Sequence, residues 1–199
     1  MPSLAARTDA RRASILEAAR RLLIRRGYQD FVLDDLAKEA GVAKGTLFLY
    51  FKTKDDLISA TFADLVDRLG AQLDELKASG STGEELLERT VQTILAHLER
   101  NSDFMSQFSA GRFPGCGDKS CERLMEKMSE NVARLTGLLK ASQTKELRFD
   151  HSAASAVSLF GLCRSALLYK RLSGGERSIE GRDRWVLERF LYGASGRKK

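Results

Sequence analysis

A short segment near the N-terminus concentrates side chains that can donate hydrogen bonds to an anion. Lys44, Thr46 and Tyr50 offer one ammonium and two hydroxyl groups, and two further lysines follow by residue 54. Residues 1–54 hold 11 Lys and Arg against six Asp and Glu, whereas the rest of the chain is nearly balanced. This distribution of charge favours a polyanionic partner for the N-terminal quarter.

The composition of the whole chain excludes several other classes of protein. It has 199 residues, of which 43% are hydrophobic, and its net charge is +6. The longest nearly apolar stretch, 153–169, contains Arg164 and is shorter than the roughly 20 residues of a bilayer-spanning helix. No apolar signal segment follows the basic N-terminus, and three cysteines are too few for a disulfide framework. We therefore expect a cytoplasmic protein that does not enter the membrane.

The pattern of apolar residues predicts an all-α fold, because spacings of three and four residues recur along the chain and alternating strand patterns are nearly absent. Gly27 is placed to end the first helix, and Thr53 with Asp56 forms a capping pair that begins a later one. About nine helices are expected, over approximately residues 8–26, 33–40, 44–50, 54–79, 82–100, 103–113, 118–139, 150–172 and 179–194.

The segment 33–50 has the residues that two closely crossing helices require. Such a crossing needs a small residue at the contact, a turn residue that tolerates positive φ, and an apolar side chain inserted from the second helix. Ala37, Gly41 and Leu47 meet these three requirements. The segment resembles a DNA-binding helix-turn-helix, whose second helix lies in the major groove.

The flanking residues extend this resemblance. A preceding helix that ends in Arg25-Arg26-Gly27-Tyr28, followed by the segment from Phe31 to Leu57, resembles the N-terminal domain of the TetR family of transcriptional regulators. The resemblance covers roughly residues 15–57. It implies a three-helix DNA-binding domain over residues 1–54 and a larger helical domain over residues 55–199 that binds a ligand and forms dimers.

The resemblance also implies roles for individual residues of the second helix. Lys44 and Thr46 would contact base edges, Tyr50 and Lys54 would contact the DNA backbone, and Leu49 would either pack on a thymine methyl group or fill the helix edge. The full set of implied DNA-binding residues is Lys44, Gly45, Thr46, Phe48, Leu49, Tyr50, Lys52 and Lys54.

Two positions depart from the family pattern. Val32 stands where related proteins often have Thr, which removes a hydroxyl that could cap the next helix and bind a phosphate. Phe48 stands where many have Tyr, so that position keeps the ring and loses the donor. Other cations would have to supply backbone contacts, and the candidates are Lys52, Arg7, Arg11 and Arg12.

In the C-terminal part, the helix that contains residues 153–169 is apolar nearly all round, so it must be covered on two sides. One side can face the core of the monomer, and the other is predicted to face a second copy of the chain. The alternative is a central helix within one monomer. The residues predicted for the dimer interface are Ala156, Leu159, Phe160, Cys163, Trp185 and Phe190.

Aromatic residues and methionines cluster between residues 104 and 128, and such side chains can line an adaptable apolar cavity. The candidate ligand-binding residues are Phe104, Met105, Phe108, Phe113, Met125 and Met128, and each of them could instead belong to the core. Cys116, Cys121 and Cys163 could sense redox state or bind a metal, but neither their spacing nor nearby ligands are diagnostic, so unreactive thiols are the favoured interpretation.

No catalytic or metal-binding pattern is present, because His97 and His151 are far apart and lack nearby ligands at suitable spacing. No cofactor and no enzyme activity are expected. The sequence predicts a homodimeric repressor that binds a palindromic operator in double-stranded DNA and is released by a small-molecule inducer. The alternatives are a transcriptional activator and a small-molecule or thiol redox sensor that acts through protein contacts.

Overall fold

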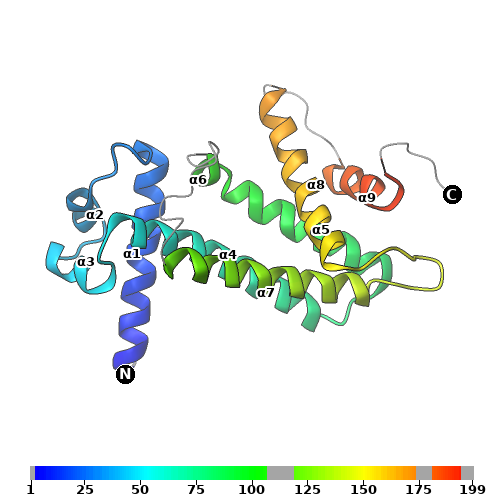
Figure 1. The fold of residues 1–199 in the computed structure, drawn as a ribbon, viewed down its shortest axis with the longest axis horizontal. Helices are drawn as coiled ribbons and strands as arrows, with labels where there is room; N and C mark the ends of the chain where they lie inside the picture. Colours follow the sequence, from blue (N-terminus) through cyan, green and yellow to red (C-terminus); the bar gives the residue numbers. More distant parts are fainter. Residues whose placement is uncertain (1–2, 107–118, 174–180, 194–199) are drawn as a thin grey trace. The chain divides into compact units, whose positions relative to one another are not determined.

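The structure is a computed structural model of the whole chain, and it describes residues 3–106, 119–173 and 181–193. The described residues form helices and contain no strand, which confirms the predicted all-α class (Figure 1). In chain order the helices are α1 (Leu4–Arg26), α2 (Leu33–Glu39), α3 (Lys44–Tyr50), α4 (Lys54–Ala78), α5 (Gly83–Arg100), α6 (Ser102–Ser106), α7 (Lys119–Ala141), α8 (Ala153–Leu172) and α9 (Arg182–Tyr192).

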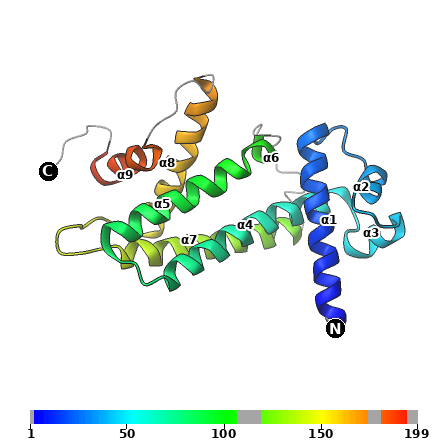
Figure 2. The same ribbon diagram turned by 180° about the vertical axis from the view of Figure 1, so that it is seen from behind.

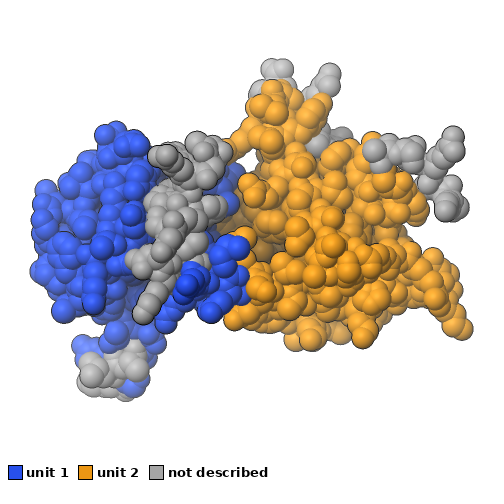
Figure 3. Space-filling model, viewed as in Figure 1, with its two compact units in different colours: residues 1–67, 102–127 blue, residues 68–101, 128–199 orange. Residues whose placement is uncertain are grey.

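The chain divides into two compact units (Figure 3). Unit 1 comprises residues 1–67 and 102–127, and unit 2 comprises residues 68–101 and 128–199. Helices α4 and α7 each contribute to both units, so this division does not coincide with a boundary at residue 54. The division into a DNA-binding domain, 1–54, and a ligand-binding and dimerisation domain, 55–199, stays a prediction. None of the helices in the described ranges is both long enough and apolar enough to cross a membrane.

In unit 1, α1 supplies the apolar surface on which α2 and α3 pack. Ile15, Leu22 and Leu23 have no more than 1% of their surface exposed, because their spacing of one, seven and eight residues places them on one face of the helix. Buried residues of α2, α3, α4 and α6 complete this core, and the rings of Phe62 and Phe104 lie 4.7 Å apart between centroids. Figures 1 and 2 show α1, α2 and α3 together at one end of α4.

Ion pairs reinforce the contact between α1 and α2. Glu39 accepts hydrogen bonds from Arg21, at 3.3 Å, and from Arg25, while Asp35 accepts one from Arg26. Although burial opposes ionisation of Glu39, the hydrogen bonds from Arg25 and Arg21 hold the pKa of its carboxyl group below the usual value. These three arginines of the basic N-terminal segment therefore bind acidic groups of the same chain.

In unit 2, α5, α8 and α9 pack around a second core together with parts of α4 and α7. The inward face of α8 carries Ala156, Leu159 and Cys163, whose exposed fractions are 1%, 0% and 0% within the single chain. A side chain without exposed surface cannot contact a second copy in this conformation. The prediction that placed these three residues in a dimer interface is therefore corrected: they belong to the core of one chain.

His97 of α5 is a buried histidine whose ionisation opposes folding. Burial, together with the positive charges of Arg100 and Arg68, lowers its pKa to about 4. The unfolded chain takes up a proton near the ordinary pKa of about 6.5, whereas the folded chain does not. The contribution of His97 to stability is therefore complete above about pH 6.5 and declines as the pH falls towards 4.

We expect the free energy of unfolding to fall by about 2 kcal/mol between pH 7 and pH 5 because of His97, and urea denaturation at the two pH values measures this. The His97→Gln variant should show a smaller decline, since its amide does not titrate. His151→Gln controls for the loss of a histidine as such, and a decline that is equal in wild type and His97→Gln would contradict the assignment.

Gly41 occupies the turn between α2 and α3 with φ of +64°, which costs a residue with a Cβ atom roughly 1–2 kcal/mol. Gly41→Ala should therefore lower the free energy of unfolding by about that amount. Gly45→Ala is the matched control, because Gly45 is helical and an added Cβ meets nothing within 4 Å. It should be neutral or stabilising by up to about 1 kcal/mol. Equal effects of the two substitutions in chemical denaturation would refute this role for Gly41.

Candidate DNA-binding interface

The turn between α2 and α3 fixes which side chains of α3 reach solvent. Leu47 is fully buried and Ala37 is 5% exposed, while the N–H of Val42 donates to the carbonyl of Ala37 at 3.0 Å. With Gly41 in the left-handed conformation, the chain reverses over only four residues between the two helices. Ala37, Gly41 and Leu47, the three residues predicted to form the helix crossing, thus lie at the buried positions and in the turn, as expected. The opposite face of α3 remains open to solvent.

That open face carries the predicted DNA-binding residues of α3. Lys44, Gly45, Phe48 and Leu49 are exposed, and Thr46 and Tyr50 are partly exposed. Leu49 is 85% exposed and Phe48 is 42% exposed, so α3 presents two large apolar side chains as well as donors. An apolar surface next to hydrogen-bond donors suits the major groove, where thymine methyl groups lie beside base acceptors.

Lys44 is engaged within the chain. Its Nζ atom lies 2.6 Å from Oδ1 of Asp34 on α2, and both side chains are more than half exposed. A base contact by Lys44 would require exchange of this ion pair for guanine acceptors. The sequence analysis missed Asp34, because the contact joins residues ten positions apart across a turn whose geometry the sequence pattern does not give.

Lys54 has a different environment from the one implied by a phosphate contact. Its Nζ atom donates to the carbonyl of Tyr28 at 2.6 Å and lies 4.3 Å from the centroid of the Tyr28 ring. The hydroxyl of Tyr28 donates in turn to Asp55 at 3.1 Å, and burial together with Asp55 raises the pKa of Tyr28. The start of α4 is therefore tied to the loop after α1, and Lys54 reaches DNA only if part of this contact is given up.

The predicted capping pair at the start of α4 is confirmed. The N–H of Asp56 donates to the hydroxyl of Thr53 at 3.0 Å, and the N–H of Thr53 donates to the carboxylate of Asp56 at 3.1 Å. Val32 precedes α2 and makes no side-chain cap, as its missing hydroxyl dictates. It is 51% exposed beside the open surface of the helix-turn-helix.

The additional cations proposed for backbone contacts lie on exposed positions. Arg7, Arg11 and Lys52 are exposed, and the guanidinium of Arg12 lies 5.5 Å from the centroid of the Phe51 ring. Phe51 itself is 4% exposed and belongs to the core of unit 1, as the sequence analysis expected.

The predicted ligand-binding residues have unlike environments. Phe104 is fully buried in the core of unit 1 and Met105 packs against that core, whereas Met125 and Met128 are 58% and 43% exposed. Phe108 and Phe113 lie outside the described residues. The ligand-binding role of this set stays a prediction.

The remaining residues predicted for the dimer interface are Phe160, Trp185 and Phe190, and each is partly buried. The ring of Phe190 meets that of Phe149 at 5.5 Å between centroids, and the guanidinium of Arg189 lies 5.8 Å from the Trp185 ring. Part of each side chain remains accessible to a second molecule.

Thiol and metal chemistry find little support in the described residues. Burial raises the pKa of the Cys163 thiol to about 12, and a thiol that stays protonated is a poor nucleophile. Cys116 and the side chain of Cys121 lie outside the described structure. Across the described ranges, no group of three or more His, Cys, Asp or Glu is arranged to hold a metal ion.

The arrangement of α1, α2 and α3 defines a helix-turn-helix protein of the kind that binds DNA, and comparison with known proteins gives the family. Residues 15–61 match the family model described as "Bacterial regulatory proteins, tetR family". The N-terminal part of the chain therefore carries the DNA-binding domain of the TetR family of transcriptional regulators, over about a quarter of the chain's length.

Two curated relatives come from Bacillus subtilis strain 168. The "Fatty acid metabolism regulator protein" is 33% identical over 73 residues, which cover 37% of this chain and 38% of that protein. The "Uncharacterized HTH-type transcriptional regulator YhgD" is 26% identical over 122 residues, which cover 61% of this chain and 63% of that protein. The matches thus span between about a third and two thirds of the relatives' length.

Solved structures share the fold over nearly the whole chain. The transcriptional regulator FadR from Bacillus subtilis, in complex with stearoyl-CoA, has a TM-score of 0.72 at 20% identity and covers 91% of this chain and 98% of its own. FadR from Bacillus halodurans has a TM-score of 0.73 at 20% identity and covers 94% and 97%. These likenesses show the fold, an N-terminal helix-turn-helix followed by a larger helical part.

The Asp34–Lys44 ion pair leads to a prediction about DNA affinity. Asp34→Asn removes a carboxylate that competes for Lys44, so binding to DNA of random sequence should tighten by about three- to tenfold at low salt. Fluorescence anisotropy with labelled duplex measures this affinity.

Asp30→Asn is the matched control, because Asp30 is exposed in the loop before α2 and the charge change is the same. A smaller effect is expected for this control. If Asp30→Asn and Asp34→Asn tighten binding equally, the gain comes from net charge and the ion pair has no specific role.

Proposed function

We propose that the protein is a homodimeric transcriptional repressor that binds a palindromic operator through α3 of each copy and is released by a small-molecule effector. The observation that carries the proposal is the open face of α3, where Lys44, Thr46, Phe48 and Leu49 stand opposite the buried Leu47. A recognition helix needs this arrangement, because its outer face must enter the groove while its inner face stays packed. As a regulator of bacterial type, the protein would act in the cytoplasm, where the DNA is.

In the proposed complex, α3 lies in the major groove. Lys44 exchanges Asp34 for the acceptors O6 and N7 of guanine, and Thr46 donates to a base or a phosphate. Leu49 packs on a thymine methyl group, which would account for a leucine that is 85% exposed. The hydroxyl of Tyr50 and the ammonium of Lys52 contact the DNA backbone and fix the register of the helix.

The proposed dimer uses the outer face of α8, since the inner face is taken by the core. Small or apolar residues follow one another there at spacings of three, four, seven and four: Ala154, Val157, Gly161, Leu168 and Leu172. Val157, Leu168 and Leu172 are 55%, 58% and 78% exposed, and the space beside Gly161 is open. An exposed apolar row of this length is unusual on the surface of a monomer. It suits close contact with the same helix of a second copy.

Dimer formation sets the form of the operator. Two copies related by a two-fold axis read two half-sites in opposite directions, and the recognition helices would lie about 34–36 Å apart, or wider by part of a turn where two dimers share one operator. An effector that binds better to a conformation with another spacing would weaken DNA binding by the same coupling energy, of order 1–3 kcal/mol. Stearoyl-CoA, the ligand named for the B. subtilis FadR structure, is a first compound to test.

The test is selection of operator DNA from a random duplex library, followed by anisotropy with the selected site at two salt concentrations. We expect a palindromic site with Kd near 10⁻⁸ M or tighter, as is typical of specific protein–DNA complexes. Lys44→Ala should weaken binding more than tenfold, and Leu49→Ala should relax the preference for thymine at one position of each half-site.

Lys77→Ala is the matched control for Lys44→Ala, because Lys77 is an exposed lysine near the end of α4 in unit 2. It should leave operator affinity unchanged within about twofold. Recovery of no preferred site, or equal affinities of the Lys44→Ala and Lys77→Ala variants, would reject α3 as the recognition helix.

A further inference from the structure

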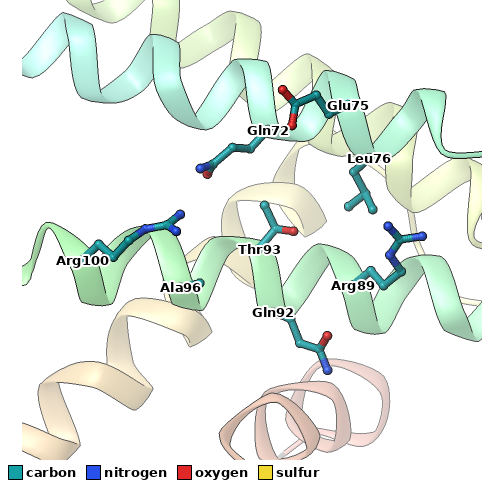
Figure 4. Close-up of a pocket in the computed structure, with 8 residues that line it drawn as sticks. All are labelled: Gln72, Glu75, Leu76, Arg89, Gln92, Thr93, Ala96 and Arg100. Atoms are coloured by element: carbon teal, nitrogen blue, oxygen red, sulfur yellow. The ribbon is translucent and has the colours of Figure 1, made fainter.

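A polar groove in unit 2 has no part in the interface described above. It lies between α4 and α5 and has a volume of about 420 Å³, within the range of sites for small metabolites. Figure 4 shows side chains from both helices around it. The lining residues are Gln72, Glu75 and Leu76 from α4 and Arg89, Gln92, Thr93, Ala96 and Arg100 from α5.

The sequence of α5 accounts for the groove. Leu87, Val91, Ile94 and Leu98 face the core, so the opposite stripe faces outwards. Arg89, Thr93, Ala96 and Arg100 recur on that stripe at spacings of four, three and four residues. The small side chains in its centre leave space between the helices, and the two arginines stand about 16 Å apart along the helix axis, since each residue adds about 1.5 Å.

Arg100 gives one end of the groove a positive charge that no described acidic group neutralises. The structure records no ion pair for its guanidinium. Its positive charge is the second cause of the low pKa of His97, and burial is the first. A guanidinium with five N–H donors matches the planar geometry of a carboxylate and the oxygens of a phosphate.

Arg89 adds positive charge at the other end and is held in place. Its Nη1 atom donates to the hydroxyl groups of Ser81, at 2.5 Å, and Ser79, at 3.3 Å, and lies 3.6 Å from Glu85. Glu75 is the one acidic residue in the lining, so cations outnumber anions there.

Gln72 supplies a hydrogen-bond acceptor that lacks a donor. Its Oε1 atom is buried and has no hydrogen-bond partner, and the side chain extends from α4 toward α5 in Figure 4. A buried acceptor without a partner is destabilising, and a donor from a bound molecule would satisfy it. Gln92, by contrast, is already engaged, because its amide donates to Asp183 at 2.7 Å.

From the unneutralised charge of Arg100 and the unpartnered oxygen of Gln72, we propose that this groove binds a small organic anion that carries a hydroxyl or N–H group beside its acidic group. The carboxylate or phosphate accepts from Arg100, and the neighbouring donor binds Oε1 of Gln72. The side chain of Thr93 on α5 also lines the groove, so its hydroxyl can contact the bound molecule. The inference rests on the proposed function, in which such a molecule would be the effector.

Two matched pairs of compounds test this chemistry by isothermal titration calorimetry on the full chain without DNA, at fixed ionic strength. Citrate and tricarballylate are both tricarboxylates, and only citrate carries a hydroxyl group. Glycerol 3-phosphate and propyl phosphate are both phosphate esters, and only glycerol 3-phosphate carries free hydroxyl groups on its carbon chain. Comparison between the pairs decides whether the acidic group is a carboxylate or a phosphate. We expect saturable binding of at least one hydroxylated compound, several-fold tighter than binding of its matched partner.

Substitutions then assign the contacts. Arg100→Gln should weaken binding at least tenfold, because it removes a charge-assisted hydrogen bond. Arg184→Gln is the matched control, since Arg184 is exposed on α9 and pairs only with Glu188 of its own helix among the contacts recorded for its side chain. Gln72→Leu should retain anion binding and lose the preference for the hydroxyl, and Gln72→Met serves the same purpose if the leucine variant does not fold.

Absence of saturable binding by all four compounds would overturn the proposal, as would equal affinities of the Arg100→Gln and Arg184→Gln variants. A hydroxyl preference that persists in Gln72→Leu would also overturn it. Because these titrations contain no DNA, their failure leaves the operator experiment standing, and failure of operator binding leaves these titrations interpretable.

Discussion

The open face of α3 depends on one buried side chain, that of Leu47, which lies in the core that includes Leu36 of α2 and Ile15 of α1. Full burial of a leucine side chain contributes about 1.5–3 kcal/mol, and here it also sets the rotation of α3 about its own axis. A helix of seven residues has too few internal hydrogen bonds to be stable alone. The orientation of Lys44, Thr46 and Leu49 is therefore a consequence of packing against α2 and, through it, against α1.

Part of the positive charge of the N-terminal quarter is paired with acidic groups of the same chain, so fewer cations are free than the number of Lys and Arg suggests. Arg21, Arg25 and Arg26 bind acids of α2, and Lys44 binds Asp34. Such pairs hold neighbouring helices together and lower the field that those cations present to a polyanion. The cations that remain exposed without a recorded ion pair include Arg7, Arg11 and Lys52, so in the proposed complex the long-range attraction of DNA would rest mainly on the first helix and the segment after α3.

The sequence predicted local features well because the forces behind them are local. The turn at Gly41, the Thr53–Asp56 capping pair and the helix-forming periodicity all depend on residues within a few positions of one another. The contacts that it missed join distant positions: Lys54 binds the carbonyl of Tyr28, 26 residues earlier. Helix α8 posed a different difficulty, since a helix that is apolar on all sides gives no indication of which face enters the core. Ala156, Leu159 and Cys163 were consequently assigned to the wrong face.

Helix α4 connects the two parts of the proposed mechanism through the covalent chain. Its first residue, Lys54, is tied to Tyr28, and further along it Gln72 and Leu76 line the polar groove. A ligand can change DNA affinity only by binding two conformations unequally, so some element must differ between them. In the proposed switch this element would be α4, whose 25 residues run from Lys54 at one end to Ala78 at the other. The hydrogen bond and ring contact of Lys54 with Tyr28 lie at the first of those ends. They tie the start of α4 to the loop that follows α1.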